Sequence, residues 1–123
     1  KGSTKEPFKM TGGVGSWRYM APEVVRYQNY CEKVDIFSFG LILFFMSSGR
    51  DPFYEMREAD GMLKEYLKGN EPRPKTSDCH KALRDIMAAA WHQDPLKRPS
   101  ATELASRLAD VSMATKCSTC PSM

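Results

Sequence analysis

The sequence lacks a hydrophobic run long enough to cross a membrane. Its longest apolar stretch, residues 36–46, is interrupted by Ser38 and Gly40, whereas a transmembrane helix needs about 20 consecutive apolar residues. No N-terminal segment has the pattern of a signal peptide, and only four cysteines are present. We therefore expect a soluble, cytoplasmic protein with reduced thiols and no membrane partner.

The sequence also lacks a strong excess of charge of one sign. Its 123 residues include 18 Lys and Arg against 15 Asp and Glu, a net charge of +3. These basic residues are spread along the chain, while a nucleic-acid-binding surface needs them clustered. We therefore expect no nucleic-acid partner. The 41% of hydrophobic residues is ordinary for a globular domain and excludes wholesale disorder.

Residues that bind metals or carry redox chemistry are scarce. The two histidines, His80 and His92, fall on or at the end of one predicted helix, and we expect His80 to be solvent-exposed rather than a ligand. Cys117 and Cys120 have C-x-x-C spacing, but a structural zinc site needs four ligands and no second pair matches. A redox role would need a βαβ context that is missing. An inert tail is favoured, no metal is expected, and the role of these cysteines stays open.

Apolar spacing predicts an all-helical fold with no strands. Pro22 suits the first position of a short helix, and residues 34–46 are apolar on every side, which is typical of a buried central helix that ends at Gly49. Amphipathic helices are predicted over residues 55–68 and 79–91, and a third after Pro99, where Ser100 and Glu103 have capping-box spacing and Leu104, Leu108 and Val111 form the apolar stripe. Residues 1–16 are predicted to be a loop, and the last residues a frayed tail.

Four elements occur in an order and spacing that coincidence does not explain. The first is Ala21-Pro22-Glu23, which resembles the A-P-E that ends a protein-kinase activation segment. Residues 35–40 resemble the kinase D-x-W-S-x-G element, and residues 49–53 resemble the G-x-x-P-F turn after it. Residues 91–100 are similar to the W-x-x-D-P-x-x-R-P-[ST] element.

The sequence therefore resembles the C-terminal lobe of a protein kinase, from the activation loop to the last helix. Arg18-Tyr19-Met20 before the A-P-E resembles the tyrosine-kinase-like group of Ser/Thr kinases. The resemblance implies a mainly α fold, namely the helical C-terminal lobe without the N-terminal lobe. It divides the chain into a partial activation loop (1–16), the C-lobe helices (17–111) and a flexible tail (112–123).

The resemblance also implies where a protein substrate binds. Ser16, Trp17 and Arg18 match the loop that positions the substrate beside the catalytic aspartate. Thr11 and Ser16 are the candidates for phosphorylation, because a phosphate adds nearly two negative charges that can pair with arginine. Val14 stands where many similar kinases have a phosphorylatable residue, which argues against a two-site switch.

Four further residues have structural roles in the family pattern. Glu23 and Arg98 are expected to form a buried bidentate ion pair that holds the activation segment on the helical core; a surface pair is the alternative. Asp35 can complement the dipole of the central helix, and the resemblance adds that it holds the catalytic loop. Trp91 is expected to be core packing beside Arg98.

Residues for phosphoryl transfer itself are missing from the sequence. It contains no H-R-D-x-x-x-x-N, no D-F-G and no V-A-I-K motif. We expect ATP and Mg²⁺ to be bound by a parent kinase that phosphorylates protein Ser/Thr hydroxyls, with an upstream N-lobe and catalytic loop as partners of this segment. The chain alone is expected to be inactive and to expose an apolar patch. The alternative is a pseudokinase or degenerate kinase remnant that acts as a helical binding module.

Overall fold

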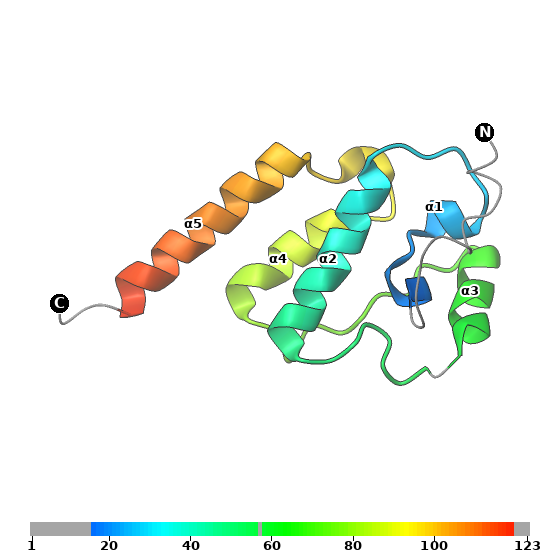
Figure 1. The fold of residues 1–123 in the computed structure, drawn as a ribbon, viewed down its shortest axis with the longest axis horizontal. Helices are drawn as coiled ribbons and strands as arrows, with labels where there is room; N and C mark the ends of the chain where they lie inside the picture. The colour runs from blue at the N-terminus through cyan, green and yellow to red at the C-terminus, as the bar shows by residue number, and fades with distance from the viewer. Residues whose placement is uncertain (1–15, 57, 120–123) are drawn as a thin grey trace.

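The computed structural model describes residues 16–56 and 58–119, and these form helices joined by turns and loops, with no strand among them (Figure 1). The mainly α fold is therefore confirmed over this part of the chain. In chain order the elements are η3 (Ser16–Tyr19), α1 (Pro22–Val25), α2 (Lys33–Ser48), α3 (Ala59–Leu67), α4 (Lys81–Ala90), η4 (Pro95–Lys97) and α5 (Ala101–Thr119).

Helix α2 is the central element, and it lies beside α4 (Figure 1). It ends at Gly49, which adopts a left-handed conformation with φ 78° and donates its backbone N–H to the Phe45 carbonyl at 2.9 Å, as the sequence predicts. Midway along α2, a Cβ added to Gly40 would lie 2.9 Å from the Cβ of Ala90. Glycine at this position therefore permits the close approach of α2 and α4.

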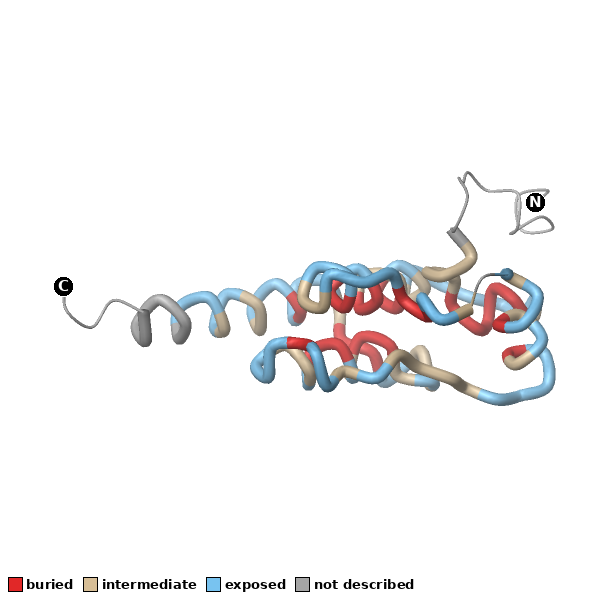
Figure 2. The backbone as a smooth tube through the Cα atoms, turned by 90° about the horizontal axis from the view of Figure 1, so that it is seen from below, coloured by how far each residue is buried: buried red, intermediate tan, exposed pale blue. Residues whose placement is uncertain are grey.

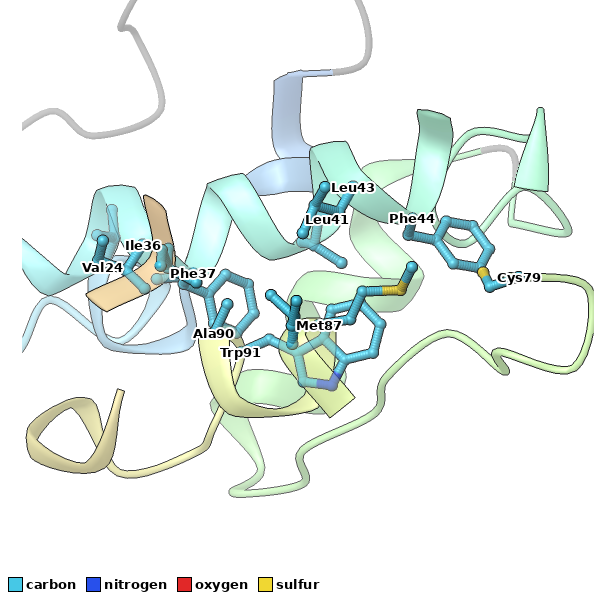
Figure 3. Close-up of a cluster of buried hydrophobic side chains, with 13 residues drawn as sticks. Val24, Ile36, Phe37, Leu41, Leu43, Phe44, Cys79, Met87, Ala90 and Trp91 are labelled. Carbon is cyan, nitrogen blue, oxygen red and sulfur yellow. The ribbon is translucent and has the colours of Figure 1, made fainter. Parts of the chain in front are cut away.

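The main hydrophobic core fills the contact between α2 and α4. Phe37 and Leu41 of α2 are fully buried against Met87 and Ala90 of α4, and Trp91 closes the cluster at the end of α4 (Figure 3). A second, smaller cluster joins α1 to α3. It consists of Val25, Phe53, Met62 and Tyr66, with Trp17 and Met20 packed against it.

One side of α2 stays uncovered by the described residues. Ile42, Phe45 and Met46 are exposed although they belong to the most apolar helix of the chain. The exposed apolar patch expected from the sequence is therefore present.

Two helices begin later than the sequence predicts, one after a backbone turn and the other after a side-chain cap. Helix α3 begins at Ala59 rather than at residue 55, since the preceding residues form a turn in which the Met56 N–H donates to the Phe53 carbonyl at 2.9 Å. Helix α4 begins at Lys81, where the Nδ1 of the N-cap His80 accepts the Ala82 N–H at 3.1 Å. His80 is exposed, as expected.

Helix α5 begins with the predicted capping box. The Glu103 N–H donates to Ser100 Oγ at 3.1 Å, and the Ser100 N–H donates to Glu103 Oε1 at 2.8 Å. Leu104 is buried against the main core, and the helix then extends away from the other helices (Figure 2). It continues to Thr119, through residues that the sequence predicts to be a tail, because residues 112–119 contain no Gly or Pro to end the helix.

The long α5 does not have the composition of a membrane span. Within the described part of the chain, no helix has both the length and the hydropathy that crossing a bilayer requires.

Candidate functional site

The short helix η3 contains the residues predicted to position a protein substrate. It contacts both α2 and α3. The Ser38 hydroxyl of α2 donates to the Tyr19 carbonyl at 2.7 Å and so fixes the end of η3. Ser16 begins η3, and its side chain lies outside the described residues, as does the whole of Thr11. Their predicted roles in substrate binding and phosphorylation stay predictions.

Arg18 anchors η3 to the turn that follows α2. Its Nη1 donates to the carbonyls of Pro52 at 2.9 Å and Phe53 at 2.7 Å, and its Nη2 donates to the Met56 carbonyl at 3.0 Å. The guanidinium also lies over the Trp17 ring, 4.5 Å from its centroid. These bonds hold the two predicted substrate-binding side chains, Trp17 and Arg18, in one fixed arrangement.

The turn that Arg18 holds is strained. Phe53 has φ 57°, a left-handed conformation that bulky residues rarely adopt, yet its side chain is buried in the smaller core. Three hydrogen bonds from one guanidinium to carbonyls of this turn offset that strain. Arg18 therefore has a clear structural role in addition to its predicted role toward substrate.

Glu23 and Arg98 form the buried bidentate pair that the sequence predicts. Arg98 Nη1 donates to Glu23 Oε2 at 2.7 Å, and Nη2 donates to Oε1 at 3.0 Å. The Arg98 side chain is 0% exposed and that of Glu23 is 7% exposed, so the surface-pair alternative is wrong. Two further donors are used too, because Nε donates to the His92 carbonyl at 2.8 Å and Nη1 donates to the Lys33 carbonyl at 3.0 Å.

The aromatic ring of Phe37 lies beside this pair. The Arg98 guanidinium carbon lies 5.0 Å from the Phe37 ring centroid, and the guanidinium carbon of Arg73 lies 4.9 Å from it. The Lys33 ammonium donates to the Arg98 backbone carbonyl at 2.6 Å. The end of the predicted activation segment is thus joined to the start of α2 and to η4 through one residue, Arg98.

The other two predicted structural residues occupy different environments. Trp91 is buried in the main core, as expected, and its carbonyl accepts from Arg73 Nε at 2.8 Å. Asp35 lies exposed in the first turn of α2, where its charge complements the helix dipole. Its predicted contact with a catalytic loop stays a prediction.

The described residues offer no metal site. They include no group of three or more His, Cys, Asp or Glu side chains placed to hold an ion. Cys31 is exposed and Cys79 is buried, and both are free thiols; burial raises the pKa of the Cys79 thiol, which makes it a poor thiolate. Cys120 and the Cys117 side chain lie outside the described residues.

Three charged residues near the site were not predicted from the sequence. Arg26, Glu71 and Arg73 form two further ion pairs, with N–O distances of 2.7 Å for Arg26 and Glu71 and 2.8 Å for Arg73 and Glu71. No motif marks them. The one available signal is that Glu71 and Arg73 alternate with Pro72 and Pro74, which restrict the backbone of the segment that follows the helix stop.

Comparison with known proteins agrees with the motifs and the geometry. The family described as protein tyrosine and serine/threonine kinase matches residues 3–108. Serine/threonine-protein kinase VIK of Arabidopsis thaliana is 39% identical over 108 residues, which is 86% of this chain and 24% of VIK. Dual specificity protein kinase shkC of Dictyostelium discoideum is 33% identical over 76% of this chain and 19% of its own length.

Mitogen-activated protein kinase kinase kinase mom-4 of Caenorhabditis briggsae is 36% identical over 76% of this chain and 17% of its own length. The chain thus spans a quarter or less of each of these three relatives.

The resemblance to the C-terminal lobe of tyrosine-kinase-like Ser/Thr kinases is confirmed. The chain belongs to the protein tyrosine and serine/threonine kinase family.

Proposed function

We propose that this chain is the substrate-positioning part of a protein Ser/Thr kinase, which transfers the γ-phosphate of ATP to Ser and Thr hydroxyls of other proteins. The observation that carries the proposal is the buried Glu23–Arg98 pair, which holds the Ala21-Pro22-Glu23 end of the segment on the helical core. The similarity to VIK, a serine/threonine-protein kinase, and to mom-4, a mitogen-activated protein kinase kinase kinase, supports the same class of reaction.

Phosphoryl transfer depends mainly on positioning and on neutralising charge. The geometry of η3 suits the positioning of a substrate, because η3 is held at Tyr19 by the Ser38 hydroxyl and at Arg18 by three backbone carbonyls. Such a segment presents Ser16 and Trp17 from a rigid backbone. We infer that these residues line the site for the acceptor side chain and the residue that follows it.

The described residues include no group of three or more His, Cys, Asp or Glu side chains that could hold Mg²⁺. We therefore derive no step through the nucleotide. When bound, ATP supplies the phosphoryl group, and this segment contributes the placement of the acceptor. The chain alone is proposed to be inactive.

Thr11 and Ser16 are proposed as phosphorylation sites of the same segment. A phosphate on either residue adds close to two negative charges to the chain, at Ser16 or five residues before it in the sequence. The described arginines nearest in sequence, Arg18 and Arg26, already donate to backbone carbonyls. A phosphate there would thus have to compete with these bonds or recruit a cation from elsewhere.

The test is a transfer assay with the full-length protein, labelled γ-phosphate ATP, Mg²⁺ and a generic basic protein acceptor, followed by phosphoamino-acid analysis. Label on phosphoserine and phosphothreonine is the expected result. Label on phosphotyrosine alone would contradict the Ser/Thr assignment. A folded protein that transfers no label would contradict the proposal and favour the pseudokinase alternative, a helical binding module.

A further inference from the structure

Arg26 ties α1 to the end of α3. It follows α1 directly, three positions after Glu23, and its Nε donates to the Tyr66 carbonyl at 2.6 Å. Its Nη2 reaches the Asn70 carbonyl at 3.2 Å and Glu71 Oε2 at 2.7 Å. The Tyr66 carbonyl also accepts from the Gly69 backbone N–H at 3.0 Å, so Arg26 adds a second, charged donor to a carbonyl in the last turn of α3.

Glu71 bridges two arginines. While Oε2 accepts from Arg26, Oε1 accepts from Arg73 Nη2 at 2.8 Å. Arg73 is held further by the carbonyls of Pro72 at 3.0 Å and Trp91 at 2.8 Å. The side chains of all three charged residues are between 16% and 21% exposed. Water therefore screens these pairs much less than it screens ordinary surface pairs.

The two ion-pair systems meet at Phe37. Arg73 and Arg98 both lie against its ring, at 4.9 and 5.0 Å. Two cations beside one ring repel each other, and an anion close to each cation offsets this repulsion. Arg98 has Glu23, and Arg73 has Glu71. A continuous series of contacts therefore runs from Glu23 through Arg98, Phe37, Arg73 and Glu71 to Arg26, and it starts and ends at α1.

We propose that Arg26 and Glu71 form a second latch on the activation segment, and that Arg26 is a positioning residue for the protein substrate. The Glu23–Arg98 pair holds α1 toward α2 and η4, while the second latch holds it toward α3. Together they fix the direction in which the chain leaves η3 and hence the placement of Trp17. This inference rests on the proposed kinase function.

Arg26→Met in the full-length protein tests the second latch, because it keeps side-chain length and removes the donors. Arg84→Met is the matched control: Arg84 is also partly buried and donates to the carbonyls of Cys79 and Ser77, away from α1. Arg26→Lys is the conservative variant, which keeps the charge for Glu71 without the fork that reaches Tyr66. Steady-state kinetics and amide hydrogen exchange are measured for each.

For Arg26→Met we expect the KM for the protein acceptor to rise about tenfold, a coupling of about 1.4 kcal/mol, with the KM for ATP unchanged. The amides of residues 26–28, which donate to Pro22, Val24 and Glu23 carbonyls, should exchange about tenfold faster. Arg26→Lys should give smaller increases in the KM for the protein acceptor and in the exchange rate of these amides. Arg84→Met should change neither quantity.

Two results would overturn the inference. One is exchange at residues 26–28 that is equal in Arg26→Met and Arg84→Met, which would mean that no latch exists. The other is a lower kcat with both KM values unchanged, which would reduce Arg26 to general stability. If the wild-type protein transfers no phosphate, the proposed function fails, and the exchange comparison still decides whether the latch exists.

Discussion

Glu23 and Arg98, 75 positions apart in the sequence, are joined by two hydrogen bonds of 2.7 and 3.0 Å in a site closed to solvent. A carboxylate and a guanidinium match as two parallel donor–acceptor pairs, a geometry that lysine cannot reproduce. The pair connects Glu23 in α1 with Arg98, the residue that follows η4. It joins the short helix α1 directly to the residues just before α5, beside the packing of Ala21 and Val24 in the main core.

Glu23→Gln should lower the free energy of unfolding by about 3–5 kcal/mol, because the Arg98 charge is then buried without its anion. Urea unfolding measures the change. Glu65→Gln is the control, since Glu65 faces Lys68 at 3.6 Å on the exposed side of α3 and should change stability by less than about 1 kcal/mol. Equal effects of the two substitutions would contradict the buried-pair account.

Two glycine-to-alanine substitutions should change the free energy of unfolding in opposite directions. Gly40→Ala places a Cβ 2.9 Å from the Ala90 Cβ and so separates α2 from α4, which should cost about 1–3 kcal/mol of stability. Gly61→Ala in α3 meets no atom within 4 Å, and should stabilise by about 0.5–1 kcal/mol through helix propensity. Thermal melts of both variants check this, and a stabilising Gly40→Ala would contradict the tight α2–α4 contact.

Tyr66→Phe should be neutral or stabilising by up to about 1 kcal/mol at pH 7. The Tyr66 hydroxyl is buried and has no hydrogen-bond partner among the described residues, so its removal ends a desolvation cost. Burial raises the pKa of Tyr66 from 10.0 to about 12. The folded state therefore favours the protonated phenol, and this contribution is complete below pH 10 and is lost as the pH rises toward 12.

The pH dependence is measured as the difference between wild type and Tyr66→Phe. In urea titrations between pH 9 and 11.5, the wild type should lose stability more steeply than the variant. Parallel curves would mean that the Tyr66 phenol is not held in the neutral form by burial. Contributions common to both proteins cancel in the comparison.

Arg18→Lys should lower stability by about 1–2 kcal/mol, because one ammonium cannot replace a fork that reaches three carbonyls. The strained turn at Phe53 should also open more often once these hydrogen bonds are lost. Faster amide exchange at Met56, whose N–H bonds the Phe53 carbonyl, would report this directly. Unchanged exchange at Met56 would show that the turn is stable without Arg18.

Much of the fold follows from local rules in the sequence. Gly49 predicts the end of α2, and the spacing of Ser100 and Glu103 predicts the start of α5. The Glu23–Arg98 pair could be predicted as well, although only because both residues sit in motifs of a known family. Periodicity alone carries no information on contacts between residues 75 positions apart.

The rest depends on tertiary contacts that no local pattern reports. The start of α3 moves to Ala59 because carbonyls of the preceding turn are engaged by Arg18. Arg26 and Glu71 look like ordinary surface charges in the sequence, and they become a latch only when α1 and α3 are packed together.

The most direct test of the account compares the 123-residue chain with the full-length protein in one phosphoryl-transfer assay, with equal concentrations, labelled ATP, Mg²⁺ and a protein acceptor. We predict incorporation on Ser and Thr by the full-length protein and none above a blank by the chain alone. Incorporation by the chain alone, or none by a folded full-length protein, would contradict the claim that this segment positions the substrate for a kinase.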